Sequence, residues 1–308
     1  MSEVLGILTG FTEASVRVAT PLALAALGET VAERSGVINL GIEGSMLAGA
    51  LASAVAATGG GPVEGLAAAA VAGLLLALVF AAVAIGAGGD QIITGTAITL
   101  LATGVTGTVY RSVFGNAGVP LTMPTLGPIR VPVLADLPIL GTALFNQPVT
   151  TYFVYGLVPL LWFLLYRTRW GLGLRAAGES VDAARAQGVA VERSRVVAVV
   201  IGGALAGLGG GALVLAQVGT FAEQMTAGRG FIAIAIVVLG AWHPVRVAAA
   251  ALVFGAASAL QFLFQGSGYP VPYQLFLMLP YLLALAALAG RIGRVRSPAE
   301  LGRSSSRR

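Results

Sequence analysis

The chain has 308 residues, of which 57% are hydrophobic and only 10% are charged, and its formal net charge is +5. Ordinary soluble domains contain about 25% charged residues, so this composition excludes a water-soluble globular protein. The chain has no cysteine and a single histidine, His243. Disulfides, a metal centre and cysteine- or histidine-based catalysis are therefore not expected, and no metal site is predicted.

Nine apolar segments follow one another along the chain, and most approach the ~20 residues that a helix needs to cross a bilayer. They cover residues 15–28, 44–59, 63–87, 92–113, 149–166, 196–218, 229–242, 245–264 and 273–290. Backbone polar groups cannot stay unpaired in hydrocarbon, so these segments must be helices, and the 43 glycines favour close helix packing. The sequence predicts an all-α, polytopic transmembrane bundle of about 8–10 spans.

The bundle is expected to form a single membrane domain over residues 1–296, followed by a disordered tail, residues 297–308, rich in Arg and Ser. Residues 1–14 lack the pattern of a cleaved signal peptide, so we expect the first helix to be retained. Arginines concentrate in the tail and in the loop at 167–195. The positive-inside rule places both in the cytoplasm, which puts residues 114–148 and 265–272 outside and residues 29–43 inside. The positive net charge is thus explained by topology, without a nucleic-acid partner.

Residues 28–44 form a polar, glycine-rich connector between the first two apolar segments. The connector contains three glutamates, Arg34 and glycines at positions 36, 41 and 44. These glycines allow a break between helices, and Asn39 and Glu43 could then face a hydrated cavity or pair with Arg34. The alternative is a cytoplasmic turn with surface ion pairs.

The fourth apolar segment begins with polar side chains. Asp90 follows two glycines and is expected to cap the helix N-terminus. Amide and hydroxyl groups lie along the first turns of this helix, where they could bind sugar hydroxyls or base edges; they belong to Gln91, Thr94, Thr96 and Thr99. The alternative is that the polar start of this helix only caps its N-terminus.

The loop at 167–195 contains the stretch 175–189, with alanines, acidic residues early, arginine late and a terminal Gly188. This order predicts a short capped helix. Further along the chain, polar residues flank the outer ends of two helices: Gln217, Glu223, Gln224, Thr226 and Arg229. We interpret Gln217, Glu223, Thr226 and Arg229 as an outer gate or as rim residues that contact a partner outside the membrane. Solvation of helix ends is the alternative.

Three stretches carry a resemblance to a known family. Residues 32–44 (AERSGVINLGIEG) resemble the signature of permeases in branched-chain amino acid, ribose and nucleoside importers, and residues 90–95 (DQIITG) and 226–233 (TAGRGFIA) are similar to its nucleoside branch. The resemblance spans nearly the whole chain. The chain departs from the pattern at Thr99, where many relatives have Asn, and at His243, where Asn or Arg is more usual.

The resemblance implies a permease subunit of an ATP-binding cassette importer in the bacterial inner (plasma) membrane, moving nucleosides. Its partners would be a second permease subunit, in a heterodimer, a cytoplasmic ATP-binding subunit and an external solute-binding lipoprotein. The chain has no phosphate-binding loop of the form GxxxxGK[ST]. It is thus expected to be no enzyme and to bind no cofactor, with ATP used by the partner ATPase.

In similar permeases the cytoplasmic loop docks the ATPase, so the resemblance assigns this coupling role to the loop at about 168–195. The residues expected to form the coupling element are Glu179, Ser180, Ala183, Ala184 and Gly188. A simple-sugar or branched-chain amino acid permease is the alternative inside the family. Outside it, an ion-coupled secondary transporter would use Glu43 or Asp90 as its ion site, and an intramembrane enzyme is disfavoured by the missing catalytic residue types.

Overall fold

The computed structural model describes residues 2–115, 123–135, 137, 140–266, 275, 278–291 and 296–303, and most of them are helical. The first half contains α1 (Ser2–Arg34), α2 (Ile42–Gly60), α3 (Pro62–Phe80), the π-helical η1 (Ala81–Gly86) and α4 (Gln91–Phe114). The second half contains α6 (Val149–Arg167), α7 (Arg169–Glu179), α8 (Val181–Ala186), α9 (Val191–Leu213), η2 (Val214–Val218), α10 (Arg229–Leu239), α11 (Pro244–Gly266) and α13 (Leu279–Arg291).

Six of these helical stretches are long and apolar enough to cross a membrane, which confirms a polytopic helical bundle. They are Ile42–Gly60, Pro62–Gly86, Gln91–Phe114, Val149–Arg167, Val191–Val218 and Pro244–Gln261. Three other helices fall on segments that the sequence marks as apolar. Of these, α1 is 33 residues long but carries several charged side chains, while α10 and α13 have only 11 and 13 residues.

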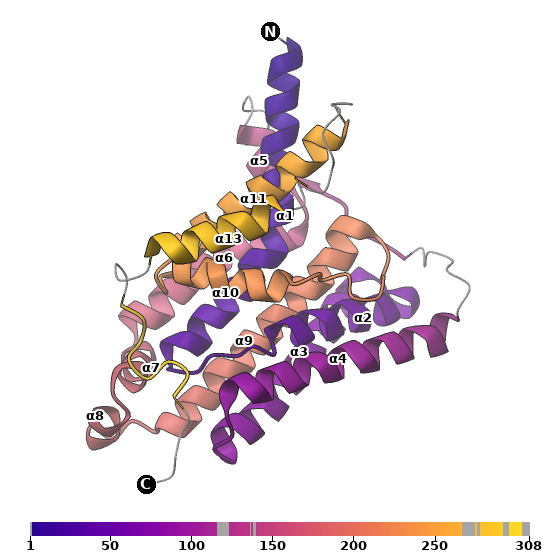
Figure 1. Cartoon of the computed structure of the whole chain (residues 1–308). Helices are drawn as coiled ribbons and strands as arrows, with labels where there is room; N and C mark the ends of the chain where they lie inside the picture. The colour runs from indigo at the N-terminus through magenta and orange to yellow at the C-terminus, as the bar shows by residue number, and fades with distance from the viewer. Residues whose placement is uncertain are drawn as a thin grey trace.

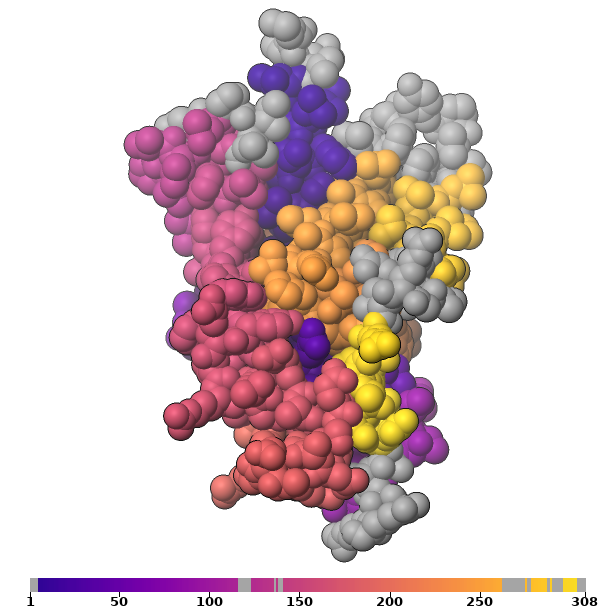
Figure 2. All heavy atoms as spheres, turned by 90° about the vertical axis from the view of Figure 1, so that its left-hand side faces the viewer, coloured from indigo at the N-terminus to yellow at the C-terminus, as the bar shows by residue number. Residues whose placement is uncertain are grey.

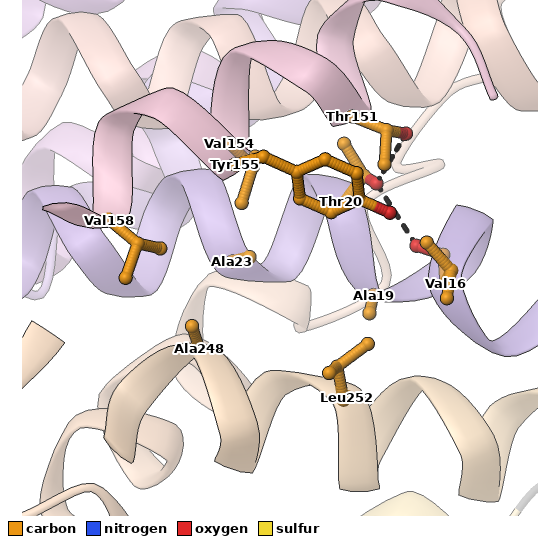
Figure 3. Close-up of a pocket in the computed structure, with 10 residues that line it drawn as sticks. All are labelled: Val16, Ala19, Thr20, Ala23, Thr151, Val154, Tyr155, Val158, Ala248 and Leu252. Carbon is orange, nitrogen blue, oxygen red and sulfur yellow. Dashed lines mark hydrogen bonds between the residues drawn. The ribbon is translucent and has the colours of Figure 1, made fainter. Parts of the chain in front are cut away.

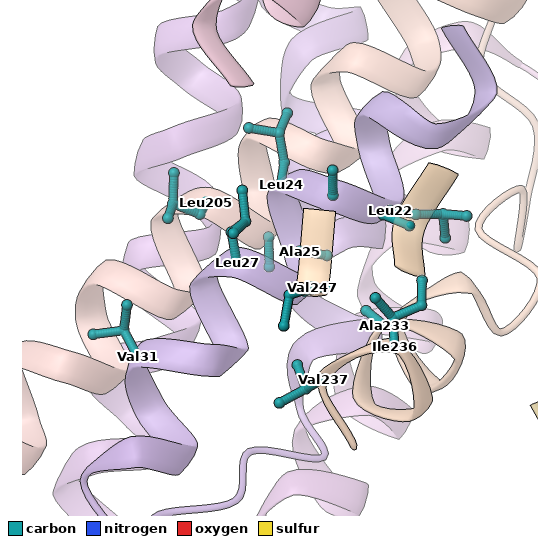
Figure 4. Packing of buried hydrophobic residues seen from close by; sticks show 14 of the residues in the cluster. Leu22, Leu24, Ala25, Leu27, Val31, Leu205, Ala233, Ile236, Val237 and Val247 are labelled. Atoms are coloured by element: carbon teal, nitrogen blue, oxygen red, sulfur yellow. The ribbon is translucent and has the colours of Figure 1, made fainter. Parts of the chain in front are cut away.

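The helices α1 and α9 form the centre of the bundle, and their packing depends on small residues. Leucine gains little from leaving lipid for a helix interface, so close backbone contact must supply the stability. A side chain on Gly210 would place its Cβ 1.8 Å from the carbonyl oxygen of Met46, and one on Gly207 would come within 2.1 Å of that of Ala69. The larger apolar residues around α1 fill the space beside these contacts, as Figure 4 shows for Leu22, Leu27, Leu205 and Ile236.

The two ends of the molecule differ. In Figure 1 the N-terminal part of α1 and the short helix α5 (Leu140–Phe145) lie at one end, whereas α7 and α8 lie at the other. The strands β1 (Ile129–Arg130) and β2 (Asn146–Gln147) pair antiparallel beside α5. This separation agrees with the sidedness expected from the arginines. Parts of the expected outer loops, residues 116–122 and 267–272, lie outside the described residues.

Two local expectations need correction. The stretch 175–189 forms parts of two helices, because Ser180 leaves the helical conformation and its hydroxyl accepts a hydrogen bond from the Ala183 N–H at 3.3 Å. The tail was expected to be disordered from residue 297, yet residues 296–303 are folded against the bundle, with turns at 299–302. Backbone hydrogen bonds to other elements, which composition does not reveal, account for this order. Residues 304–308 lie outside the described residues.

Candidate functional site

The connector between α1 and α2 breaks the helix at Gly36, whose φ of +88° suits glycine. Its turn is held by buried side chains. The Asn39 N–H donates to Glu29 Oε1 at 2.8 Å, and Asn39 Oδ1 accepts from the Gly41 N–H at 2.9 Å. The Asn39 side chain, a predicted pathway residue, is thus engaged within the connector.

Glu43 joins two stretches of the chain that the sequence analysis singled out separately. Its Oε1 accepts from the Thr226 hydroxyl at 2.6 Å and from the Gly228 N–H at 2.9 Å, and its Oε2 accepts from the Gly230 N–H at 2.6 Å. Gly228 is the N-cap of α10, so the carboxylate lies where a helix dipole favours negative charge. The structure therefore places Glu43 and Thr226 in one buried knot, which we call the Glu43 knot.

Two of the predicted polar residues of α4 bind the connector, and the other two bind the backbone at the start of their own helix. Gln91 Oε1 accepts from the Ile38 N–H at 2.9 Å, and the Thr99 hydroxyl donates to the Leu40 carbonyl at 3.1 Å. The hydroxyls of Thr94 and Thr96 donate to carbonyls of their own helix, at Asp90 and Ile92. Four of the six predicted pathway residues, namely Asn39, Glu43, Gln91 and Thr99, thus hold the connector and its neighbours together, while Thr96 is exposed.

The helix cap expected at Asp90 is present. Its side chain accepts from the Ile93 N–H at 2.9 Å, which confirms the N-cap role. Glu29 and Glu33 are both buried on α1. Glu33 accepts a hydrogen bond from the indole of Trp242, and Arg34 donates to the Trp242 carbonyl at 2.9 Å. These contacts tie the end of α1 to the turn between α10 and α11.

The outer polar residues are placed in two different surroundings. Glu223 forms an exposed ion pair with Arg111 of α4, with an N–O distance of 3.0 Å. Gln217 and Arg229, by contrast, line a cavity of about 130 Å³ between α1, α10, α11 and α13. The polar side chains of this cavity are Gln217, Arg229, Ser258, Gln261 and Tyr281. We call it the polar cavity.

Several groups in the polar cavity retain hydrogen-bonding capacity. Arg229 Nη1 donates to the carbonyls of Met225 and Thr226, but no carboxylate among the described residues forms a salt bridge with it. The amide of Gln261 has no hydrogen bond to the described part of the chain. Because a polar group inside a membrane protein normally finds a partner or lines a water-filled path, these groups are suited to contact a polar solute.

A second pocket of this bundle is apolar, in contrast to the polar cavity. About 100 Å³ in volume, it lies between α1, α6 and α11 and is lined mainly by alanine, valine and leucine (Figure 3). Its hydroxyls on Thr20 and Thr151 are hydrogen-bonded to each other at 2.9 Å. None of the lining residues is charged, and Tyr155 is the one further polar side chain that lines this pocket.

Ser258, Gln261 and Tyr281 were not predicted from the sequence as site residues. Each is a single polar residue within or beside an apolar segment, and only the packing of α11 and α13 against α10 brings the three to one cavity. A polar residue isolated in a membrane helix was the available signal, since such residues commonly mark substrate paths.

The predicted coupling residues gather at the end of the molecule formed by α7 and α8. Glu179, Ala183 and Gly188 are exposed, whereas Ala184 is buried against Ala177 and Val191. Ser180 provides the N-cap of α8. An ion pair between Arg185 and Glu192 joins α8 to α9, and hydrogen bonding to Glu192 raises the pKa of Arg185. The α7–α8 loop is thus held to α9 on one side, while its other side is exposed.

Known proteins match the chain over most of its length. A family model described as the permease component of branched-chain amino acid transport systems matches residues 11–288. The guanosine ABC transporter permease protein NupQ of Bacillus subtilis is 36% identical, over 96% of each chain. The nucleoside ABC transporter permease protein NupC of Lactococcus lactis is 31% identical, over 91% of each. The putative glucose ABC transporter permease protein TsgC13 of Haloferax volcanii is 41% identical, over 82% of this chain and 77% of that protein.

Proposed function

Since this chain belongs to the family of permease components of branched-chain amino acid transport systems, and is a multi-pass protein of the bacterial plasma membrane, we propose that it forms the path by which an ATP-driven importer moves nucleosides. The two nucleoside permeases that resemble it align over more than nine-tenths of both chains. This full-length similarity is the observation that carries the proposal.

The chemistry of the polar cavity supports a nucleoside as the solute. A nucleoside offers ribose hydroxyls, which amides and hydroxyls can bind, and a base with acceptor atoms on its edge. Arginine forms two hydrogen bonds with the O6 and N7 acceptors of guanine, a pairing familiar from DNA recognition. Arg229, with donors that meet no carboxylate among the described residues, could make this contact, and Gln217 and Gln261 could bind the ribose.

A sugar is the second candidate solute, favoured by the 41% identity to the putative glucose permease. The amides and hydroxyls of the polar cavity suit sugar hydroxyls as well as ribose. Arg229 favours the nucleoside, because a neutral sugar has no pair of base acceptors for a guanidinium to bind.

The partner subunits are proposed from family membership and from the exposed residues of the α7–α8 loop. This chain would hydrolyse no ATP itself; a cytoplasmic ATP-binding subunit would dock on the exposed residues Glu179, Ala183 and Gly188. Figure 2 shows this loop, in rose, protruding at one end of the molecule. A second permease subunit would complete the path, and an external lipoprotein would deliver the solute near Glu223.

Uptake of labelled solutes by cells with and without this gene tests the proposal. We expect deletion to reduce import of guanosine and uridine at least tenfold while leaving leucine import unchanged, with recovery when the gene is restored. Loss of glucose import alone would move the assignment to the sugar branch. Unchanged import of nucleosides and sugars would refute the proposal.

A further inference from the structure

The C-terminal segment Pro298–Arg303 binds to three elements that are distant in sequence. Its Glu300 N–H donates to the Gly178 carbonyl of α7 at 2.9 Å, and its Gly302 N–H donates to the Gly36 carbonyl after α1 at 3.3 Å. Its Arg303 carbonyl accepts from Gln91 Nε2 of α4 at 2.9 Å. Figure 2 shows the segment, in yellow, lying against the rose-coloured α7–α8 region. We call residues 298–303 the strap.

The strap is shaped to make these contacts. The Leu301 N–H donates to the Pro298 carbonyl and the Arg303 N–H to the Glu300 carbonyl, both at 3.1 Å, so the strap forms a compact turn. Pro298 is buried and Leu301 packs against the main hydrophobic core. The exposed Ala299 between them has neither role.

The surroundings of the strap leave little space for independent movement. A Cβ on Gly178 would lie 2.3 Å from the Arg34 carbonyl oxygen, so the end of α7 touches the end of α1 directly. A Cβ on Gly36 would lie 3.0 Å from both Glu300 Cβ and Arg195 Nη2. That Nη2 atom is buried without a hydrogen-bond partner, and the Glu300 side chain beside it carries the opposite charge.

The contacts of the strap point to a mechanical role. Gly178 lies three residues before α8, the helix proposed to dock the ATPase, while Gly36 and Gln91 belong to the connector and to α4. A displacement of α8 that carries the end of α7 with it, relative to α1 and α4, must either break the hydrogen bonds of the strap or move all these elements together.

We propose that the strap is a positioning element that links the α7–α8 loop to the α1–α2 connector and to α4, so that movement of the docked ATPase reaches the helices of the solute path. This inference rests on the proposed function. It assigns a role in coupling to Leu301, Glu300 and Gln91.

A matched pair of variants tests the strap in the complete complex reconstituted into proteoliposomes. Leu301→Asp places a charge in the apolar anchor, whereas Ala299→Asp introduces the same charge two residues away at an exposed position. We expect Leu301→Asp to lower the number of guanosine molecules transported per ATP hydrolysed at least fivefold, with hydrolysis retained. Ala299→Asp should keep the wild-type ratio.

Gln91→Glu provides a second test that leaves the apolar anchor intact. It keeps the oxygen that accepts from Ile38 but replaces the donor to the Arg303 carbonyl by another acceptor. We expect the same loss of coupling, about twofold to fivefold. A wild-type ratio in both Leu301→Asp and Gln91→Glu would overturn the role of the strap, whereas a wild-type complex without ATP-driven nucleoside uptake would overturn the proposed function instead. If Leu301→Asp fails to assemble, the Gln91→Glu ratio decides.

Discussion

The Glu43 knot and the polar cavity both adjoin the start of α10, and they differ in how fully their polar groups are paired. In the knot, both oxygens of Glu43 are occupied by donors from residues 226–230. In the cavity, the Gln261 amide has no partner among the described residues and the Arg229 guanidinium pairs with no carboxylate there. A family motif such as residues 32–44 therefore marks the framework, while less distinctive residues line the proposed solute path.

The largest effect is expected from breaking the knot. Glu43→Ala leaves the N–H groups of Gly228 and Gly230 without their acceptor in a buried place, and hydrogen bonds to charged groups contribute roughly 1.5–3 kcal/mol each. We expect unfolding in detergent to require at least about 3 kcal/mol less free energy, as measured by tryptophan fluorescence during denaturation. Glu64→Ala removes an exposed carboxylate from the first turn of α3 and should change the stability by less than about 0.5 kcal/mol.

Equal stability of the Glu43→Ala and Glu64→Ala proteins would show that the knot is not a structural element. Glu43 would then be free for the pathway role that its sequence position suggested.

A smaller effect is expected from a substitution in the polar cavity, and this substitution should change transport and leave stability unchanged. Arg229→Met keeps an unbranched apolar stem but removes the guanidinium. Loss of one charged hydrogen bond to the solute corresponds to about a tenfold change, so we expect initial guanosine uptake to fall about tenfold with normal amounts of folded protein. Arg246→Met removes an exposed arginine from α11 and serves as the control, with uptake within twofold of wild type.

If Arg229→Met transports guanosine at the wild-type rate, the guanidinium only supports the carbonyls of Met225 and Thr226. Arg229 in the polar cavity would then have no role in solute transport.

The sequence predicts the features that depend on local chemistry. Apolar length and the cost of unpaired backbone groups predicted the helical bundle, glycines predicted the break near Gly36, and Asp90 after two glycines predicted a helix cap. Each of these follows from interactions within a few residues. The split of 175–189 at Ser180 was missed because serine is compatible with a helix interior as well as with its cap.

Features that depend on contacts between residues far apart in the sequence could not be predicted. Glu43 and Thr226 are 183 residues apart, and nothing in either motif shows that they bind each other. Composition marked the tail as disordered because Arg and Ser are common there. The order of residues 298–303 comes from the backbone hydrogen bonds of Glu300 and Gly302 to Gly178 and Gly36. The cavity residues on α11 and α13 likewise become neighbours only through packing.

Modification of a single cysteine in the polar cavity tests most directly whether the solute passes there. The chain has no cysteine of its own, so Ser258→Cys provides one thiol in this subunit, in a complex whose other subunits also lack cysteine. We predict that a small, membrane-impermeant thiol reagent stops nucleoside uptake by this complex and that guanosine slows the modification. A fully modified protein that still imports guanosine at its original rate would contradict the account.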